Sequence, residues 1–317
     1  MSAVTSGSAS ASGGRGGLAI GVDVGGTKIA AGVVDERGQV ITSMRRPTPS
    51  HDRVEVADTI AALVTDLIAA MRTERPQDEV TAVGIGAAGW IDRDRATVLF
   101  APNLAWRNEP LRDEVARRVG LPVVVENDAN AMAWAEYRFG AGRGHTDLVC
   151  VTVGTGIGGG LVLDGRLQRG AFGIGAEMGH MIMVPGGLPC GCGNRGCWEQ
   201  YASGRALVRL AREMATSTPS AARAMLGGRS PEELTGPDIT AAARDGDPAA
   251  TKCFEEIGHW LGRGLASLAA VLDPSRFVIG GGVSDAGELL VGPTRSQFRA
   301  DLPGRGHRPE EIGRAHV

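Results

Sequence analysis

The sequence predicts an α/β protein of two domains that carries a structural zinc loop. Apolar strand patterns alternate with amphipathic helix patterns, which is typical of α/β folds. A pattern of strand, glycine-threonine turn, strand and aspartate occurs at residues 22–35 and again at residues 151–164, which indicates two related domains. Three of the five cysteines lie between positions 190 and 197. A chain of 317 residues is long enough for two ordinary domains.

The first half of the chain has the pattern of a sheet with helices between its strands. We expect strands at residues 18–24, 28–34, 40–46, 80–85 and 123–125, and helices at residues 54–71 and 111–119. The first of these helices has apolar residues at the spacing of an amphipathic helix, and the second ends at Gly120. The second half is more helical. Its main elements are expected as helices at residues 203–214 and 248–272, a strand at residues 276–279 and a helix from Ser284.

Composition excludes several classes of partner. The 33 Lys and Arg residues nearly balance the 36 Asp and Glu residues, so the net charge of −3 creates no electrostatic demand for nucleic acid or an acidic membrane. No apolar run reaches the roughly 18–20 residues of a membrane span. The few cysteines suit a reducing compartment, and we expect a cytoplasmic protein. Residues 1–17 lack the apolar core of a signal peptide and are expected to form a disordered leader.

Four potential zinc ligands lie close together in the chain. They are His180, Cys190, Cys192 and Cys197. Zinc takes four sulfur or nitrogen ligands, and a site with three cysteines and one histidine is completely filled, which is typical of structural zinc. The alternatives are a disulfide pair or a chance cluster. An odd number of cysteines in one dense group argues against both.

Two acidic residues bracket this loop, Glu177 on one side and Glu199 on the other. A metal ion that holds both ends of the loop would also fix these carboxylates in space. Fixed carboxylates and a histidine nitrogen are suitable partners for a polyhydroxylated ligand such as a sugar. The alternative is that both glutamates are solvated loop charges.

Glycine-rich turns predict phosphate binding. Residues 23–28 read DVGGTK, and the backbone N–H groups of Gly25, Gly26 and Thr27 could form a nest for phosphate oxygens. This is not a Walker A loop, which continues into a helix. The repeat places a second such turn at residues 154–156. A third glycine turn, centred on Gly281, follows a strand, where open α/β sheets bind ligands. Plain tight hairpins remain the alternative.

Three polar residues, Glu126, Asn127 and Asp128, follow the strand at residues 123–125 and begin a helix that ends at Gly140. Asn and Asp are good helix caps, so capping is one explanation. A carboxylate at this edge could instead accept a proton from an alcohol, with Asn127 orienting it. Both explanations stay open on the sequence pattern alone.

These motifs together resemble the bacterial ROK family, named for repressors, open reading frames and kinases, and within it the ATP-dependent glucokinases of actinobacteria. The motifs are DVGGTK at 23–28, ENDAN at 126–130, GTGIGG at 154–159, EMGH at 177–180 and the CxCGxxGCxE run at 190–199. The resemblance covers residues 18 to about 309. It implies a two-domain fold related to actin, hexokinase and Hsp70. Residues 18–125 would form a small α/β domain with the first phosphate hairpin, and residues 126–309 a large α/β domain with the second hairpin, the catalytic aspartate and the zinc loop.

The same resemblance implies the role of each site residue. Asp128 would be the general base that deprotonates the sugar 6-hydroxyl for attack on the γ-phosphoryl group of ATP. Residues that match sugar contacts are Asn103, Asn127, Asp128, Glu177, His180 and Glu199. Residues that match positions for ATP and Mg²⁺ are Asp23, which would help hold the Mg²⁺ ion, and Gly26, Thr27, Lys28, Thr155 and Gly156. The partners implied are glucose and ATP, and the family is usually a homodimer or homotetramer.

Alternatives remain within the resemblance. A ROK kinase for another hexose, such as N-acetylmannosamine or fructose, has the same motifs. A sugar-responsive transcriptional regulator of the family is less favoured, because the leader is too short and too polar for a helix-turn-helix domain. Residues 311–317 read EIGRAHV and resemble a translated sequencing adapter, so we expect residues 310–317 to be an artificial tail on a truncated chain.

Overall fold

The computed structural model shows two compact units. It describes residues 17–49, 53–101, 104, 106–220, 222–307 and 312–315. The first unit is drawn from Met1–Ala87 and Ala96–Val125, and the second from Ala88–Arg95 and Glu126–Val317. Asn103 and most of the expected leader lie outside the described residues. The domain limits expected from the sequence stay a prediction.

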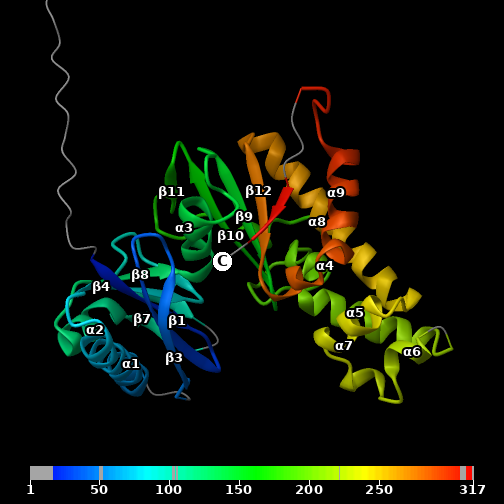
Figure 1. The fold of residues 1–317 in the computed structure, drawn as a ribbon. Helices are drawn as coiled ribbons and strands as arrows, with labels where there is room; N and C mark the ends of the chain where they lie inside the picture. The colour runs from blue at the N-terminus through cyan, green and yellow to red at the C-terminus, as the bar shows by residue number, and fades with distance from the viewer. Residues whose placement is uncertain are drawn as a thin grey trace, which may run out of the picture. The chain divides into compact units, whose positions relative to one another are not determined.

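The first unit contains a five-stranded sheet with the order β3-β2-β1-β4-β8 (Figure 1). Its strands are β1 (Leu18–Val24), β2 (Lys28–Val34), β3 (Val40–Pro47), β4 (Val80–Ala87) and β8 (Val123–Asn127). Strand β1 pairs antiparallel with β2, where Gly21 lies opposite Gly32, and parallel with β4. Alternate residues of β1 are buried, as a sheet with one covered face requires.

Two helices complete the core of this unit. Helix α1 (Arg53–Glu74) packs on β2 and β3 and against α2 (Leu111–Val119). The apolar stripe expected at residues 54–71 is buried, with Ile60, Leu63 and Leu67 almost inaccessible to water. Two short strands, β6 (Val98–Ala101) and β7 (Trp106–Glu109), pair antiparallel and were not expected from the sequence. Their residues carry no clear period of two, since β7 reads WRNE.

The second unit repeats the sheet layout with the order β11-β10-β9-β12-β13. Its strands are β9 (Leu148–Val153), β10 (Ile157–Leu163), β11 (Arg166–Gln168), β12 (Arg276–Gly280) and β13 (Ile312–Arg314). As in the first unit, two antiparallel pairs are followed by a parallel neighbour. The two repeated segments therefore form equivalent hairpins. Strand β13, in the expected tail, pairs parallel with β12 at the sheet edge.

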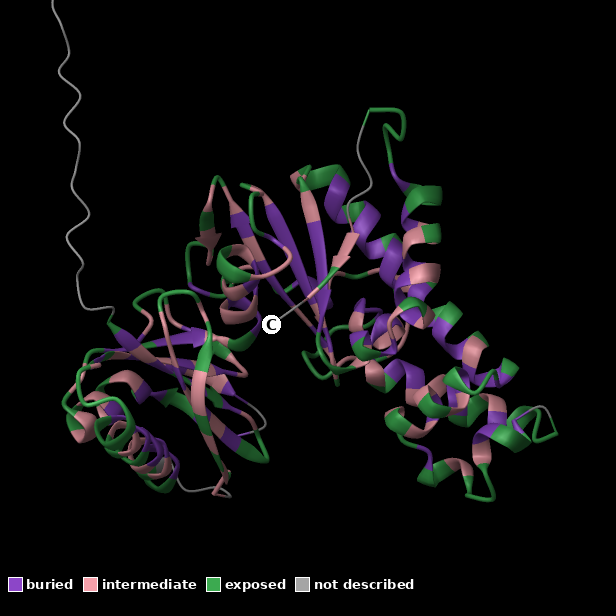
Figure 2. Cartoon of the chain, in the orientation of Figure 1, coloured by how far each residue is buried: buried purple, intermediate pink, exposed green. Residues whose placement is uncertain are grey.

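Helices cover both faces of the second sheet (Figures 1 and 2). One face packs on α3 (Asp128–Phe139), where Ala133 contacts Leu148 and Cys150. The alternate residues Val149 and Val151 face a larger core built around α8 (Pro248–Leu272). The remaining helices are α4 (Glu199–Ala202), α5 (Gly204–Ser217), α6 (Arg223–Leu226), α7 (Gly236–Arg244) and α9 (Glu288–Asp301), with short 3-10 helices η2 (Met178–His180), η3 (Pro231–Glu233) and η4 (Gly282–Ala286).

Most expected helices are observed, and α8 has the predicted bounds. The prediction of a helix from Ser284 was wrong in one respect. A 3-10 turn, η4, comes first and α9 begins only at Glu288, because Gly287 at φ 63° interrupts the helical backbone. Among the described residues, no helix is both long and apolar enough to cross a membrane.

Candidate active site

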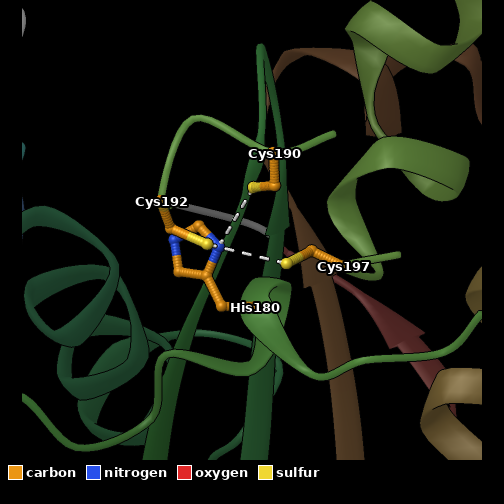
Figure 3. Close-up of side chains that lie close together, drawn as sticks. All are labelled: His180, Cys190, Cys192 and Cys197. Carbon is orange, nitrogen blue, oxygen red and sulfur yellow. Dashed lines mark hydrogen bonds between the residues drawn. The ribbon is translucent and has the colours of Figure 1, made fainter. Parts of the chain in front are cut away.

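The four expected metal ligands come together in the second unit. Atoms of His180, Cys190, Cys192 and Cys197 that could bind a metal all lie within 4.8 Å of one another. Figure 3 shows the four side chains pointing toward a common centre from η2 and from the loop between Pro189 and Trp198. The loop is folded back on itself by two β-bridges, Ile182 with Cys197 and Pro189 with Arg195.

The spacing of these atoms fits a tetrahedral ion. The sulfurs of Cys192 and Cys197 are 3.6 Å apart, and the Cys190 sulfur is 3.6 Å from His180 Nδ1. Ligands about 2.3 Å from a tetrahedral zinc ion lie about 3.8 Å from one another. A disulfide would instead bring two sulfurs to about 2.05 Å, and all five cysteines are free. The donor set and its geometry therefore suit zinc.

Trp198 anchors this loop in the core of the second unit. It follows the ligand Cys197 directly, and its side chain is fully buried. Its indole Nε1 donates a hydrogen bond of 2.8 Å to the carbonyl of Trp260 in α8. The ring lies against Gly264, where an added Cβ would be only 2.1 Å from a ring carbon. The position of Cys197 and Glu199 thus depends on the packing of Trp198 on α8.

Asn127, and not Asp128, caps helix α3. The Asn127 Oδ1 accepts from the backbone N–H of Asn130 at 3.0 Å. Its Nδ2 donates to the carbonyl of Gly89 at 3.1 Å and to Asp128 Oδ1 at 3.0 Å. The same Oδ1 of Asp128 accepts from the N–H of Ala129. The exposed carboxylate of Asp128 therefore sits in the first turn of α3, oriented by Asn127.

Glu177 shares an electrostatic environment with Asp128 and Glu199. Partial burial raises the pKa of Glu177, and the charges of Asp128 and Glu199 raise it further, while His180 opposes the shift. The Nε2 of His180 lies 3.9 Å from Glu177 Oε2. Because Nδ1 faces the cysteines, the two ring nitrogens of His180 can serve the metal cluster and the acidic cluster at once.

Glu199 contacts both the loop that carries the cysteines and the second glycine hairpin. Its Oε1 lies 3.0 Å from the sulfur of Cys190. A Cβ added at Gly156 would lie 2.5 Å from Glu199 Oε2, so the carboxylate rests directly on that glycine. The alternative that Glu177 and Glu199 are isolated, solvated charges does not fit these contacts.

The second hairpin turn, which holds Thr155 and Gly156, lies beside Gly281. A Cβ on Gly281, whose φ is 83°, would be 2.7 Å from the carbonyl oxygen of Val153. The carbonyl of Gly154 accepts from the N–H of Gly204 at the start of α5. Gly281 and the turn therefore lie at the same end of the second sheet.

The first hairpin differs from its predicted form at one donor. The N–H of Gly25 donates to the carbonyl of Lys28 at 3.0 Å, because this bond closes the hairpin. The prediction that the Gly25 N–H forms part of a phosphate nest was therefore wrong, because that N–H is already bonded. Gly26, Thr27 and Lys28 are exposed. Nearby, partial burial raises the pKa of Asp23, and the charge of Lys28 opposes that shift.

Some residues at this site were not expected from the sequence. Gly89 holds Asn127 through its carbonyl, and Arg95 and Arg169 pair with Glu126. The only available signal was the position of Gly89 two residues after β4, which neighbours β8 in the sheet.

Comparisons with known proteins show which sequences and structures this chain is similar to. A model of the ROK family matches residues 19–315. The glucokinase of Streptomyces coelicolor is 52% identical over 295 residues, which cover 92% of this chain and 90% of that protein. The glucokinase of Thermotoga maritima is 42% identical over 280 residues, which cover 88% and 86%. The crystal structure of a ROK family glucokinase from Streptomyces griseus in complex with glucose and AMPPNP matches with a TM-score of 0.84 at 55% identity, covering 94% of each chain.

Proposed function

The chain belongs to the ROK family, and on that premise we propose that it is an ATP-dependent glucokinase. It would transfer the γ-phosphoryl group of ATP to the 6-hydroxyl of glucose. The observation that carries the proposal is an acidic cluster of Asp128, Glu177 and Glu199 beside a cysteine-histidine loop, in a chain that is similar over most of its length to Streptomyces glucokinases.

Asp128 is the proposed general base. Its carboxylate is exposed in the first turn of α3, and the side chain that caps the helix is that of Asn127. Asp128 would therefore accept the proton of the sugar hydroxyl while Asn127 holds its Oδ1. A positioned base typically contributes about 10²–10⁴ in rate.

The sugar would be held by the remaining polar groups of the cluster. Glu177 and Glu199 would accept hydrogen bonds from its hydroxyl groups, and His180 Nε2 would face it. Asn103 is proposed for the same role because its position matches a sugar contact of the family. Bound zinc would supply a rigid connection between His180 and the cysteines, and so hold both glutamates in place.

ATP would be bound by backbone groups and by Mg²⁺. Phosphoryl transfer depends mainly on alignment and on the stabilisation of charge, which backbone N–H groups and metal ions supply. Mg²⁺ held by Asp23 would neutralise charge on the phosphates. The residues proposed for phosphate contacts are Gly26, Thr27, Lys28, Thr155, Gly156 and Gly281.

We propose the two-domain architecture of actin and hexokinase for this chain, with a structural zinc loop in the larger domain. The like strand orders of the two sheets support this assignment. A homodimer or homotetramer is expected, and light scattering of the purified protein would measure it.

The experiment that tests the function is a coupled assay with ATP and four sugars: glucose, mannose, fructose and N-acetylmannosamine. We expect kcat/KM to be highest for glucose. A higher kcat/KM for N-acetylmannosamine or fructose would assign the chain to the alternative ROK hexose kinases. No turnover of any of the four sugars would overturn the proposal.

A further inference from the structure

Glu126 joins three separate segments of the second unit. Its side chain is almost fully buried at the end of β8. The Oε2 atom accepts from Arg169 Nε at 2.7 Å and also lies 2.7 Å from Arg169 Nη2. Arg95 Nε lies 3.4 Å from the same oxygen. One carboxylate therefore holds the ends of residues 88–95 and of β11 together.

The other oxygen of Glu126 contacts the residues that position Asp128. Oε1 accepts from the backbone N–H of Asn127 at 3.2 Å and from Asn130 Nδ2 at 3.3 Å. Asn127 in turn holds both the carbonyl of Gly89 and Oδ1 of Asp128. A shift of Glu126 would therefore pass directly to the amide that orients the proposed base.

The two segments that Glu126 holds also pack on each other. A Cβ at Gly173 would lie 2.4 Å from the carbonyl oxygen of Ile91, so residues 169–175 lie directly on residues 88–95. The N–H of Gly175 donates to the carbonyl of Arg169, which closes the loop just before Glu177. The Glu126 ion cluster thus connects the segments that carry Gly89, Asp128 and Glu177.

Charge within the cluster makes Glu126 hard to replace. Two guanidinium groups share one carboxylate, and burial and the neighbouring Arg169 both lower the pKa of Arg95, against the effect of Glu126. Removing the negative charge leaves two like charges facing each other, which would drive the two arginine-bearing segments apart.

We propose that Glu126, together with Arg95 and Arg169, is a positioning cluster that sets the place of Asn127 and Asp128 relative to Gly89 and Glu177. The proposal rests on the assignment of Asp128 as the base of the proposed glucokinase. Glu126 itself would not touch the reacting atoms.

The test compares Glu126→Gln with Glu213→Gln, the same chemical change at the exposed ion pair of Glu213 with Arg209. A displacement of reacting groups by about 1 Å can cost about 10²-fold in rate. In Glu126→Gln we therefore expect kcat with glucose to fall by about 10- to 100-fold, with an unchanged KM for ATP and unchanged zinc content. Glu213→Gln should keep the wild-type kcat.

Three further measurements separate positioning from stability. Hydrogen exchange of amides in residues 88–95 and 169–175 should speed up in Glu126→Gln and not in Glu213→Gln. If Glu126→Gln fails to fold, Arg169→Lys takes its place in the test. Arg169→Lys keeps the positive charge and loses one contact with Glu126, so its kcat should fall below that of wild type. Glu126→Asp, which keeps the carboxylate, should recover part of the lost kcat.

The proposal is overturned if folded Glu126→Gln keeps the wild-type kcat and the wild-type exchange in both segments. It is also overturned if Glu126→Gln does not fold and Arg169→Lys keeps the wild-type kcat. If wild type and Glu213→Gln both fail to phosphorylate glucose, the proposed function fails instead, while the exchange comparison still tests the cluster.

Discussion

Gly264 in α8 has no room for a side chain. The variant Gly264→Ala therefore tests whether the packing of Trp198 on α8 holds the cysteine-histidine loop in place. A Cβ there would lie 2.1, 2.2 and 2.6 Å from three ring atoms of Trp198. The φ of Gly264 lies outside the left-handed region, and the three atoms nearest to an added Cβ all belong to the indole. Trp198 stands between Cys197 and Glu199, and any movement of its ring would shift both.

Two effects of opposite sign compete in this substitution. In an open helix position, Gly→Ala stabilises a protein by roughly 0.5–1 kcal/mol. Overpacking of a filled core costs about 1–3 kcal/mol. If the indole is driven out of its site, the loss approaches that of a large aromatic deletion, about 3–5 kcal/mol, and the bond from Trp198 Nε1 to Trp260 is broken. We therefore expect net destabilisation.

Thermal unfolding measures the sign, and an unobstructed glycine gives the control. Gly306 has open space at the position of a Cβ and its φ lies outside the left-handed region, so Gly306→Ala meets no obstacle. A change of 1 kcal/mol shifts Tm by about 2–4 °C in domains of this size. Gly264→Ala should lower Tm by several degrees and raise the KM for glucose, because Glu199 moves. Gly306→Ala should keep or raise Tm and leave KM unchanged.

The result that refutes this reasoning is a Gly264→Ala protein with a Tm at or above that of wild type and an unchanged KM for glucose. Such a result would mean that the Trp198 ring can adopt another position, and that the cysteine-histidine loop does not depend on the packing of this ring against α8.

Three further changes test the site. Asp128→Asn should keep Tm and lower kcat by at least about 10²-fold, and an unchanged kcat would remove Asp128 from the mechanism. Cys192→Ser should lower the bound zinc measured by mass spectrometry and weaken glucose binding, whereas Cys253→Ala, outside the cluster, should keep zinc; absence of zinc in the wild type would contradict the metal assignment. Gly156→Ala puts a Cβ 2.5 Å from Glu199 Oε2 and should raise the KM for glucose, while Gly154→Ala, with open space at its Cβ, should not. Equal KM values in these two variants would show that Glu199 is unimportant for the sugar.

Local pattern was sufficient where neighbours in the sequence are neighbours in space. The cysteine-histidine cluster is an example, since three cysteines within one tight loop lie close together whatever the rest of the fold does. The helix α8 is another, because its period and its Asp247 cap lie within one stretch of chain. The junction of β8 with α3 was predicted for the same reason, although the pattern left open which residue caps the helix.

The structure decided what depends on long-range packing. It joins Glu126 to Arg95 and Arg169, it bonds Asn127 to the carbonyl of Gly89, and it places Glu199 on Gly156. The strands β6 and β7 also escaped prediction, because tertiary contacts stabilise them and their residues do not alternate. The sequence by itself determined most of the elements, the cysteine-histidine cluster and the family. Only the tertiary structure decided which distant groups support the candidate base, since the contacts of Arg95 and Arg169 with Glu126, and of Gly89 with Asn127, require separate backbone segments to meet before the groups can interact.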